Sequence, residues 1–214
     1  MITPVEVKIC GLTSEADAGL LAKYGADYGG IVMFYPKSKR NTEADIAGMI
    51  VDKLKKSDIK SVAVVVSPDM EQIDIIEKTG FDYVQIHGEL KEEVYNRTGI
   101  PIIRAINIKD DDVSSVKESV EWCRRKDKIT GLLLDAGVPG SGKIFDWNNV
   151  KDLQLSGKKI ILAGGLTSDN VEEAIKTVKP DVVDVSSGVE YDDPLTKGKD
   201  ENKVKTFIRN VRKR

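Results

Sequence analysis

Short apolar runs alternate along the chain with longer segments in which apolar and charged residues mix. Residues 62–66 (VAVVV) and 161–163 (ILA) are apolar without interruption, which is typical of parallel strands covered on both faces. Residues 171–178 (VEEAIKTV) carry apolar and charged residues at helical spacing. The pattern therefore predicts parallel strands that are connected by amphipathic helices.

This alternation occurs eight times in the 214 residues. The predicted strands are residues 5–9, 28–33, 60–66, 83–86, 102–107, 131–134, 159–163 and 182–185. The predicted helices are residues 15–24, 42–56, 70–79, 91–97, 113–125, a short helix from 147, 170–178 and 202–212. Eight pairs in this length predict an α/β fold, a (β/α)8 TIM barrel, with residues 1–214 as a single domain. An open doubly wound sheet uses the same alternation and is the structural alternative.

Three side chains are predicted to cap the N-termini of helices: Ser14, Thr42 and Asp169. Ser14 and Thr42 are each followed three residues later by an aspartate, Asp17 and Asp45, in the position that Glu commonly takes in a capping box.

Composition excludes several classes of function. The 33 basic and 35 acidic residues give a net charge of -2, so the chain has no global attraction to nucleic acid or to an anionic membrane. The sequence contains no signal-peptide pattern and no apolar run near the ~18 residues of a membrane span, so we expect a cytoplasmic protein without nucleic-acid or membrane partners. Two cysteines, Cys10 and Cys123, and one histidine, His87, are too few for a disulfide framework or a familiar metal site.

The active site of a (β/α)8 barrel lies at the C-terminal ends of its strands. Polar residues and glycines follow six of the predicted strands, and we expect them to converge at one mouth of the barrel. They are Cys10, Arg40, His87, Asp135, the pair Gly164-Gly165 and the run Ser186-Ser187-Gly188.

The loops after the seventh and eighth strands are candidates for binding a phosphate group. Glycines allow backbone N–H groups to approach an anion closely, and barrels often hold phosphate in these two loops. Gly164 and Gly165 begin one loop, while Ser186, Ser187 and Gly188 begin the other. Glycine at a tight turn or a helix C-cap is the structural alternative for each position.

Cys10 and Asp135 are the candidates for proton transfer. A thiolate at Cys10 can remove a proton from carbon or act as a nucleophile, whereas a free cysteine is otherwise a small buried apolar residue. Asp135 can supply a proton, and its alternative is to cap the loop that follows. Together they supply the acid and the base that an isomerisation requires. Cys123 lies within a predicted amphipathic helix and is expected to have only a packing role.

Two further residues are candidates for substrate contact. The Arg40 guanidinium can bind a carboxylate through paired hydrogen bonds, although basic loop residues are commonly only solvated. His87, in Gln85-Ile86-His87-Gly88, is a candidate for substrate contact or for a structural role.

The glycine-rich loop after Asp135 also fits part of a nucleotide-binding P-loop. Residues 137–143 match GxxxxGK, but Ile144 occupies the position of the Ser or Thr that binds magnesium. Asp135 would also place a carboxylate close to the phosphates. Because a P-loop leaves the eightfold repeat unexplained, the barrel interpretation is favoured.

Several motifs together resemble the phosphoribosylanthranilate isomerase family, the barrel enzymes of tryptophan biosynthesis. The matching segments span the chain: residues 8–13 (KICGLT), 34–40, 85–88 (QIHG), Asp135 with residues 140–143 and 145–147 (FDW), 162–166 and 184–190 (DVSSGVE). The combination is specific, whereas a single glycine pair is a weak signal.

The resemblance implies an Amadori rearrangement that converts N-(5-phosphoribosyl)anthranilate, an aminoaldose, to an aminoketose by general acid and base catalysis. It implies Asp135 as the acid and Cys10 as the base, with Arg40 on the anthranilate carboxylate and no cofactor. It also implies substrate contact by His87 and Asp184. The phosphate-binding residues that it implies are Gly142, Gly164, Gly165, Ser186, Ser187 and Gly188. We expect the small-molecule substrate to be the principal partner of a monomer or homodimer.

Two residues depart from the family pattern: Pro139 replaces the common first glycine of the sixth loop, and Ser168 replaces a frequent proline. Neither is a proposed acid or base, but Pro139 is expected to stiffen its loop. Two rival functions remain: an aminoaldose isomerase of histidine biosynthesis, whose family uses paired aspartates, and a noncatalytic sensor of a phosphate ligand. Cys10 at the end of the first strand favours the tryptophan-pathway reaction over the first of these.

Overall fold

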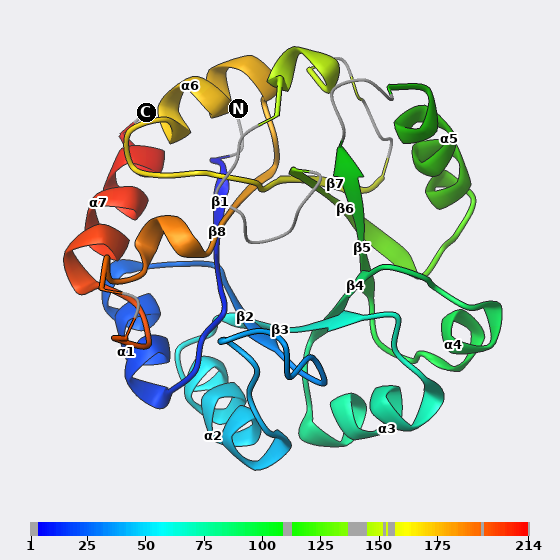
Figure 1. The fold of residues 1–214 in the computed structure, drawn as a ribbon, viewed down its shortest axis with the longest axis horizontal. Helices are drawn as coiled ribbons and strands as arrows, with labels where there is room; N and C mark the ends of the chain where they lie inside the picture. The colour runs from blue at the N-terminus through cyan, green and yellow to red at the C-terminus, as the bar shows by residue number, and fades with distance from the viewer. Residues whose placement is uncertain are drawn as a thin grey trace.

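The computed structural model describes residues 4–108, 113–136, 145–151, 153, 157–193 and 195–213, which form a closed barrel of parallel strands (Figure 1). The strands are β1 (Glu6–Cys10), β2 (Tyr28–Val32), β3 (Lys60–Val66), β4 (Tyr83–His87), β5 (Ile102–Ile108), β6 (Ile129–Ala136), β7 (Lys159–Leu162) and β8 (Val182–Val185). Each strand pairs with its sequence neighbours, and β8 pairs in parallel with β1. The predicted barrel is confirmed, and the open sheet is wrong because no edge remains.

The helices surround the barrel as an outer ring (Figure 1). They are α1 (Glu15–Tyr24), α2 (Ala44–Lys55), α3 (Met70–Thr79), α4 (Glu92–Arg97), α5 (Val113–Arg124), α6 (Val171–Val178) and α7 (Glu201–Arg212), with 3₁₀ helices η1 (Trp147–Asn149) and η2 (Ser187–Val189). The short helix predicted from Trp147 is this single 3₁₀ turn, and η2 was not predicted. Within the described residues, no helix is long and apolar enough to cross a membrane.

The barrel separates two apolar cores. The larger core lies between the strands and the helices and includes Ile9, Leu54 and Phe207. The second core lies inside the barrel. Its buried members are Cys10, Tyr28, Val62, Val64, Ile103, Ala105, Leu133, Ile161, Ala163 and Val182. Because side chains alternate between the two faces of a strand, residues two positions apart point to the same core.

Of the three predicted helix caps, one is confirmed. The Ser14 hydroxyl accepts a hydrogen bond from the Asp17 N–H at the start of α1. Thr42 is not the cap: α2 begins at Ala44, Glu43 occupies the N-cap position, and the Thr42 hydroxyl donates instead to the carbonyls of Leu12 and Arg40. Asp169 is also wrong: Asn170 occupies the N-cap position of α6.

At the N-terminal end of the barrel, an aspartate before each of three strands forms hydrogen bonds to the backbone of a neighbouring strand. Asp27, Asp82 and Asp181 immediately precede β2, β4 and β8. Each carboxylate accepts the backbone N–H of the neighbouring strand, at 2.7 Å from Val7, 2.8 Å from Ser61 and 2.8 Å from Ile160. Each aspartate also donates its own N–H to the carbonyl of the same residue.

Each of these three aspartates follows a helix whose C-cap residue is in the left-handed conformation. Gly25 (φ 79°), Gly80 (φ 85°) and Lys179 (φ 53°) are the C-caps of α1, α3 and α6, and the aspartate follows two residues later. A left-handed residue reverses the chain at the end of a helix. The sequence signal is therefore a C-cap, one intervening residue, an aspartate and a strand.

We predict that Asp181→Ala lowers the free energy of unfolding by about 0.5–1.5 kcal/mol, because one net hydrogen bond to the backbone is lost. Chemical denaturation is the measurement. Asp192→Ala is the control, because its carboxylate is 94% exposed and its surface ion pair with Lys203 contributes little. Equal losses of unfolding free energy in the two variants would contradict a stabilising role for the Asp181 hydrogen bond.

Candidate active site

One cavity of about 440 Å³ opens at the C-terminal ends of the strands. It brings together nine of the predicted site residues: Cys10, Arg40, His87, Asp135, Gly164, Gly165, Asp184, Ser186 and Ser187. Gly188 lies in η2 and is not among the residues that line the cavity. The predicted phosphate residue Gly142 and the departure at Pro139 lie outside the described residues. Side chains from separate strands thus meet in one concave space.

Cys10 is the last residue of β1, and Lys8, two residues earlier on the same strand, forms a buried ion pair. The Lys8 ammonium donates to Asp184 Oδ2 over 2.9 Å, with side-chain exposures of 0% and 7%. Burial raises the pKa of the Cys10 thiol, while the charge of Lys8 acts in the opposite direction. Burial lowers the pKa of Lys8, but Asp184 and Cys10 outweigh burial and leave that pKa raised. The lysine is therefore a fixed cation beside the thiol.

Asp135 is held inside the barrel because β6 is longer than predicted. The strand continues to Ala136, so Asp135 is its penultimate residue. Because Asp135 is two positions after Leu133, its side chain points into the barrel as that of Leu133 does. Burial, followed by the charge of Asp184, raises the pKa of Asp135 from 3.8 to about 6. A carboxyl group with this pKa is protonated in part of the molecules at neutral pH and can act as an acid.

His87 is the last residue of β4 and is neutral. Burial lowers its pKa to about 4, and the positive charges of Lys8 and Arg104 contribute. Gln85 Nε2 lies 2.9 Å from His87 Nε2. Since an amide nitrogen is a donor, this orientation makes Nε2 the acceptor and places the proton on Nδ1. That buried Nδ1 has no hydrogen-bond partner among the described groups.

Arg40 is oriented by a carboxylate rather than free in solvent. Its Nε and Nη2 donate to the two oxygens of Glu190, at 2.5 Å and 3.1 Å. Glu190 also accepts from Lys199 at 3.2 Å and forms an ion pair with Lys39 at 2.9 Å. Burial raises the pKa of Glu190, but these cations outweigh burial and hold it near 2. The guanidinium is therefore fixed at the cavity wall.

The seventh loop approaches the acid closely. Gly164 has φ 84°, and a Cβ there would lie 2.6 Å from the Ala136 nitrogen and 3.1 Å from Asp135 Oδ1. In the eighth loop a Cβ at Gly188 would lie 2.1 Å from the Leu166 carbonyl oxygen. Glycine is required at both positions, because no larger residue fits without moving backbone. The two loops consequently pack against each other and against the end of β6.

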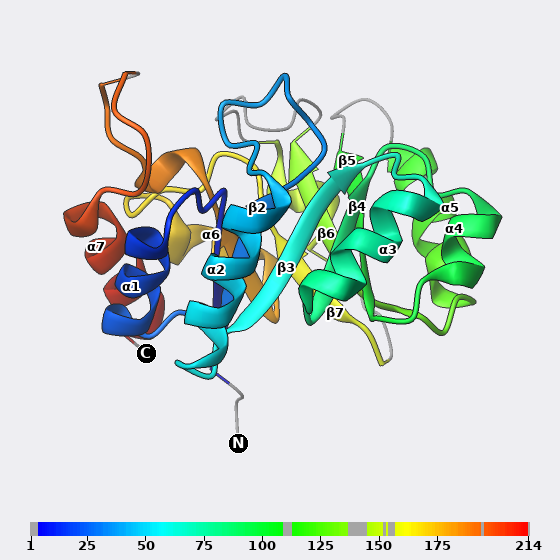
Figure 2. The ribbon, with the colours of Figure 1, turned by 90° about the horizontal axis from the view of Figure 1, so that it is seen from below.

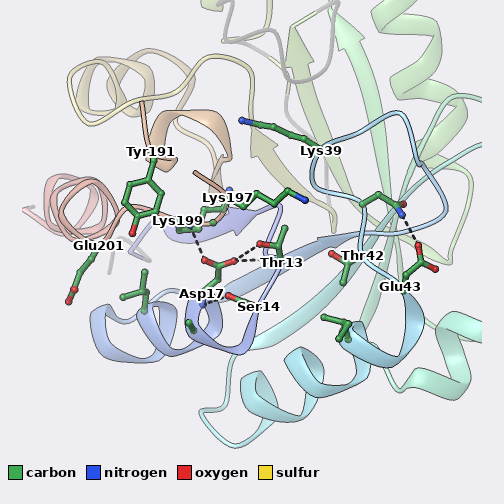
Figure 3. A pocket seen from close by; sticks show the side chains of 15 residues that line it. Thr13, Ser14, Asp17, Lys39, Thr42, Glu43, Tyr191, Lys197, Lys199 and Glu201 are labelled. Atoms are coloured by element: carbon green, nitrogen blue, oxygen red, sulfur yellow. Dashed lines mark hydrogen bonds between the residues drawn. The ribbon is translucent and has the colours of Figure 1, made fainter. Parts of the chain in front are cut away.

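A second groove, of about 650 Å³, lies outside the barrel mouth beside α1 (Figure 3). Figure 3 shows Asp17 directed at Thr13 and Lys199, and its carboxylate accepts the backbone N–H of each, at 2.8 Å and 2.9 Å. Asp17 thus ties the first loop to the segment before α7. In Figure 2 the loop after β2 and part of the segment between η2 and α7 rise above the barrel, and residues of both line the groove. The groove contains none of the proposed proton-transfer groups.

Three residues of the site were missed from the sequence. Gln85, Glu190 and Lys8 each lay inside a motif but received no role. A signal existed for Lys8: it is charged, lies in a strand that is otherwise buried, and precedes Cys10 by two residues. Alternation along the strand then places both side chains on one face.

Comparison with known proteins identifies a family that matches nearly the whole chain. The family model of N-(5'phosphoribosyl)anthranilate (PRA) isomerase matches residues 7–210. The chain is 42% identical to the N-(5'-phosphoribosyl)anthranilate isomerase of Streptococcus mutans, over 97% of this chain and 99% of that protein. It is 40% identical to the one of Aquifex aeolicus, over 97% and 98%.

Solved structures agree in fold. Phosphoribosyl anthranilate isomerase from Thermotoga maritima has a TM-score of 0.84 and 32% identity, over 98% of this chain and 100% of that one. A phosphoribosyl anthranilate isomerase in complex with reduced 1-(o-carboxyphenylamino)-1-deoxyribulose 5-phosphate has a TM-score of 0.81 and 32% identity, with the same coverage of 98% and 100%.

The raised pKa of Asp135 predicts a cost in stability. The folded carboxyl holds its proton up to about pH 6, whereas 3.8 is its ordinary value, so folding becomes less favourable as pH rises through this window. We predict that Asp135→Asn raises the free energy of unfolding at pH 8 by about 1–3 kcal/mol. Denaturant unfolding at pH 4 and pH 8 measures it. The gain should shrink towards pH 4, and a gain of equal size at both values would contradict this account. Asp192→Asn, at an exposed carboxylate, is the control.

Proposed function

The chain belongs to the N-(5'-phosphoribosyl)anthranilate isomerase family, and we propose that Asp135 and Cys10 are the acid and the base of its reaction. The activity is the isomerisation of N-(5'-phosphoribosyl)anthranilate, an aminoaldose, to an aminoketose in tryptophan biosynthesis. One observation carries the assignment: a carboxyl group and a thiol from β6 and β1 line the same cavity.

Asp135 is proposed to donate a proton to the ribose ring oxygen. The bond between that oxygen and C1 breaks, and the anthranilate nitrogen supplies the electron pair that forms an iminium ion. The raised pKa supports this role, since at pH 7 roughly one Asp135 in ten remains protonated. The carboxyl group also occupies space beside Gly164 that a side chain there would take, since a Cβ at Gly164 would lie 3.1 Å from Asp135 Oδ1.

Cys10 is proposed to remove the proton from C2 of the iminium ion. The C–H electron pair neutralises the iminium nitrogen and produces an enolamine, which tautomerises to the ketone. No atom is gained or lost overall, and the substrate nitrogen serves as the electron sink, so no cofactor is required. The burial that raises the pKa of the thiol also makes its thiolate a stronger base.

Substrate recognition is proposed to use groups that already face the cavity. Arg40 binds the anthranilate carboxylate while Glu190 holds its guanidinium in place. His87 Nδ1 and Asp184 Oδ1 are buried without partners among the described groups, so they are suited to the sugar hydroxyls. A buried polar group that gains a partner only with the substrate favours that substrate over analogues that lack the hydroxyl.

The phosphate is proposed to lie between the seventh and eighth loops. Gly164, Gly165, Ser186 and Ser187 line this part of the cavity, and Ser187 begins η2. The first N–H groups of a helical turn lack intrahelical partners and can donate to an anion. The relative solved with a reduced deoxyribulose 5-phosphate compound supports a phosphorylated ligand here. Gly142 and Gly188 remain predicted phosphate residues.

Other expectations stay predictions. We propose one domain over residues 1–214, supported by strands drawn from Glu6 to Val185 in one barrel and by α7 packing on α1 and α6. A monomer or homodimer is supported only by a Thermotoga maritima relative described both as dimeric and as monomers. The cytoplasmic location and the absence of metal, cofactor and nucleic-acid partners are likewise predictions.

We predict that Cys10→Ser and Asp135→Asn each lower kcat by about 10²–10⁴-fold, because each removes a proton-transfer group. The measurement is the loss of substrate fluorescence when N-(5'-phosphoribosyl)anthranilate is generated in place.

Matched controls distinguish chemistry from folding. Cys123→Ser removes the other buried cysteine, in α5, and should retain turnover. Asp192→Asn removes an exposed carboxylate and should also retain it. Full activity of folded Cys10→Ser would exclude Cys10 as the base, and the same result for Asp135→Asn would exclude that acid.

We predict that Arg40→Met raises KM by about 10–100-fold with a smaller change in kcat, because a charge-assisted hydrogen bond to the substrate is lost. Lys39→Met is the control, since Lys39 also pairs with Glu190 but is 53% exposed.

The phosphoribosyl adduct of aniline, which lacks the carboxylate, identifies the contact. Arg40→Met should impair this analogue far less than the natural substrate. Equal impairment of both compounds would show that Arg40 does not bind the carboxylate.

A further inference from the structure

The base of the proposed mechanism lies in a place that disfavours its active form. Cys10 is 8% exposed, and burial raises the pKa of its thiol. A general base must nevertheless lose its proton before it can accept one from carbon. Some nearby group therefore has to offset the burial of the thiolate.

The charged groups that act on Cys10 come from four parts of the fold. They are Lys8 on β1, Asp184 on β8, Arg40 in the loop after β2, and Lys199 before α7. Arg40 and Lys199 are both bound to Glu190, whose negative charge offsets theirs. Lys8 has the largest favourable effect on the thiolate. It is also completely buried, so water does not screen it.

The Lys8 ammonium and the Cys10 thiol lie next to each other beside Gly30. Lys8 and Cys10 are two residues apart on β1 and face the same side, and Gly30 of β2 pairs with Cys10. A Cβ on Gly30 would lie 2.9 Å from Cys10 Sγ and 3.2 Å from Lys8 Nζ. Both atoms thus occupy the space that a side chain at Gly30 would fill. Asp184 fixes the ammonium from the other strand neighbour, β8.

We propose that Lys8 is a positioning residue for the reaction: its buried ammonium, anchored by Asp184, faces Cys10 across Gly30 and keeps the thiol ionisable inside the barrel. The inference rests on the proposed role of Cys10 as the base. Lys8 does not line the cavity, so it acts on the substrate through Cys10.

The test measures ionisation of Cys10 directly, by the pH dependence of its alkylation with iodoacetamide in a Cys123→Ser background. Cys10 lines the open cavity, so the reagent reaches it. Lys8→Met should raise the alkylation midpoint by about one pH unit or more, because a close opposite charge is removed. It should also lower kcat about tenfold or more with a smaller change in KM.

Asp184→Asn gives the opposite shift and excludes a merely structural effect. Removing this carboxylate should lower the midpoint, since Asp184 disfavours the thiolate. If Lys8→Met does not fold because Asp184 is left unpaired, the double variant Lys8→Met/Asp184→Asn removes both charges of the pair. Its midpoint should lie above that of Asp184→Asn alone.

Lys159→Met is the matched control, because this barrel lysine pairs with Glu6 at the N-terminal end of the strands. It should leave the midpoint unchanged. Unchanged midpoints in Lys8→Met, or shifts of one sign in all variants, would overturn the proposal. Failure of the catalytic assignment gives a different result: turnover by Cys10→Ser, with the alkylation shifts intact.

Discussion

The buried ion pair between Lys8 and Asp184 is the constraint around which the site is arranged. Two charges inside a barrel lose their hydration, and their attraction compensates only if each is held close to the other. The pair is possible only because β8 closes against β1, which brings together residues 176 positions apart. The same two charges act on both Cys10 and Asp135: Lys8 lowers the pKa of each group, and Asp184 raises it. One interaction therefore joins closure of the fold to the chemistry of the cavity.

The two ends of the barrel serve different purposes. At the N-terminal end, Asp27, Asp82 and Asp181 have their carboxylates occupied by backbone N–H groups of neighbouring strands. At the C-terminal end, Asp135 is buried with a raised pKa. The first arrangement satisfies polar groups and stabilises the fold, while the second leaves an acid able to release its proton.

Sequence patterns were sufficient for the repeat but not for the charge network. Apolar runs and helical spacing located the eight strands, because those signals are local. The cap predictions at Thr42 and Asp169 were each one residue early, because the N-cap positions are Glu43 and Asn170 and neither side chain caps its helix by a hydrogen bond. Strand-end position identified Cys10 and Asp135. The contact of Arg40 with Glu190, 150 residues away, depends on the tertiary fold, and no local pattern indicates it.

The cavity combines a charged group that already has its partner with buried polar atoms that have none among the described residues, and this division supports the proposed selectivity. Arg40 is held by Glu190 before any ligand arrives, so less conformational entropy is lost when it binds an anion. His87 Nδ1 and Asp184 Oδ1, by contrast, are buried without partners among the described groups. Such groups are costly in the free protein, and that cost is relieved only by a ligand with matching hydrogen-bonding groups. If the proposed substrate contacts hold, selectivity in this barrel follows from which polar atoms the fold satisfies and which it leaves to the substrate.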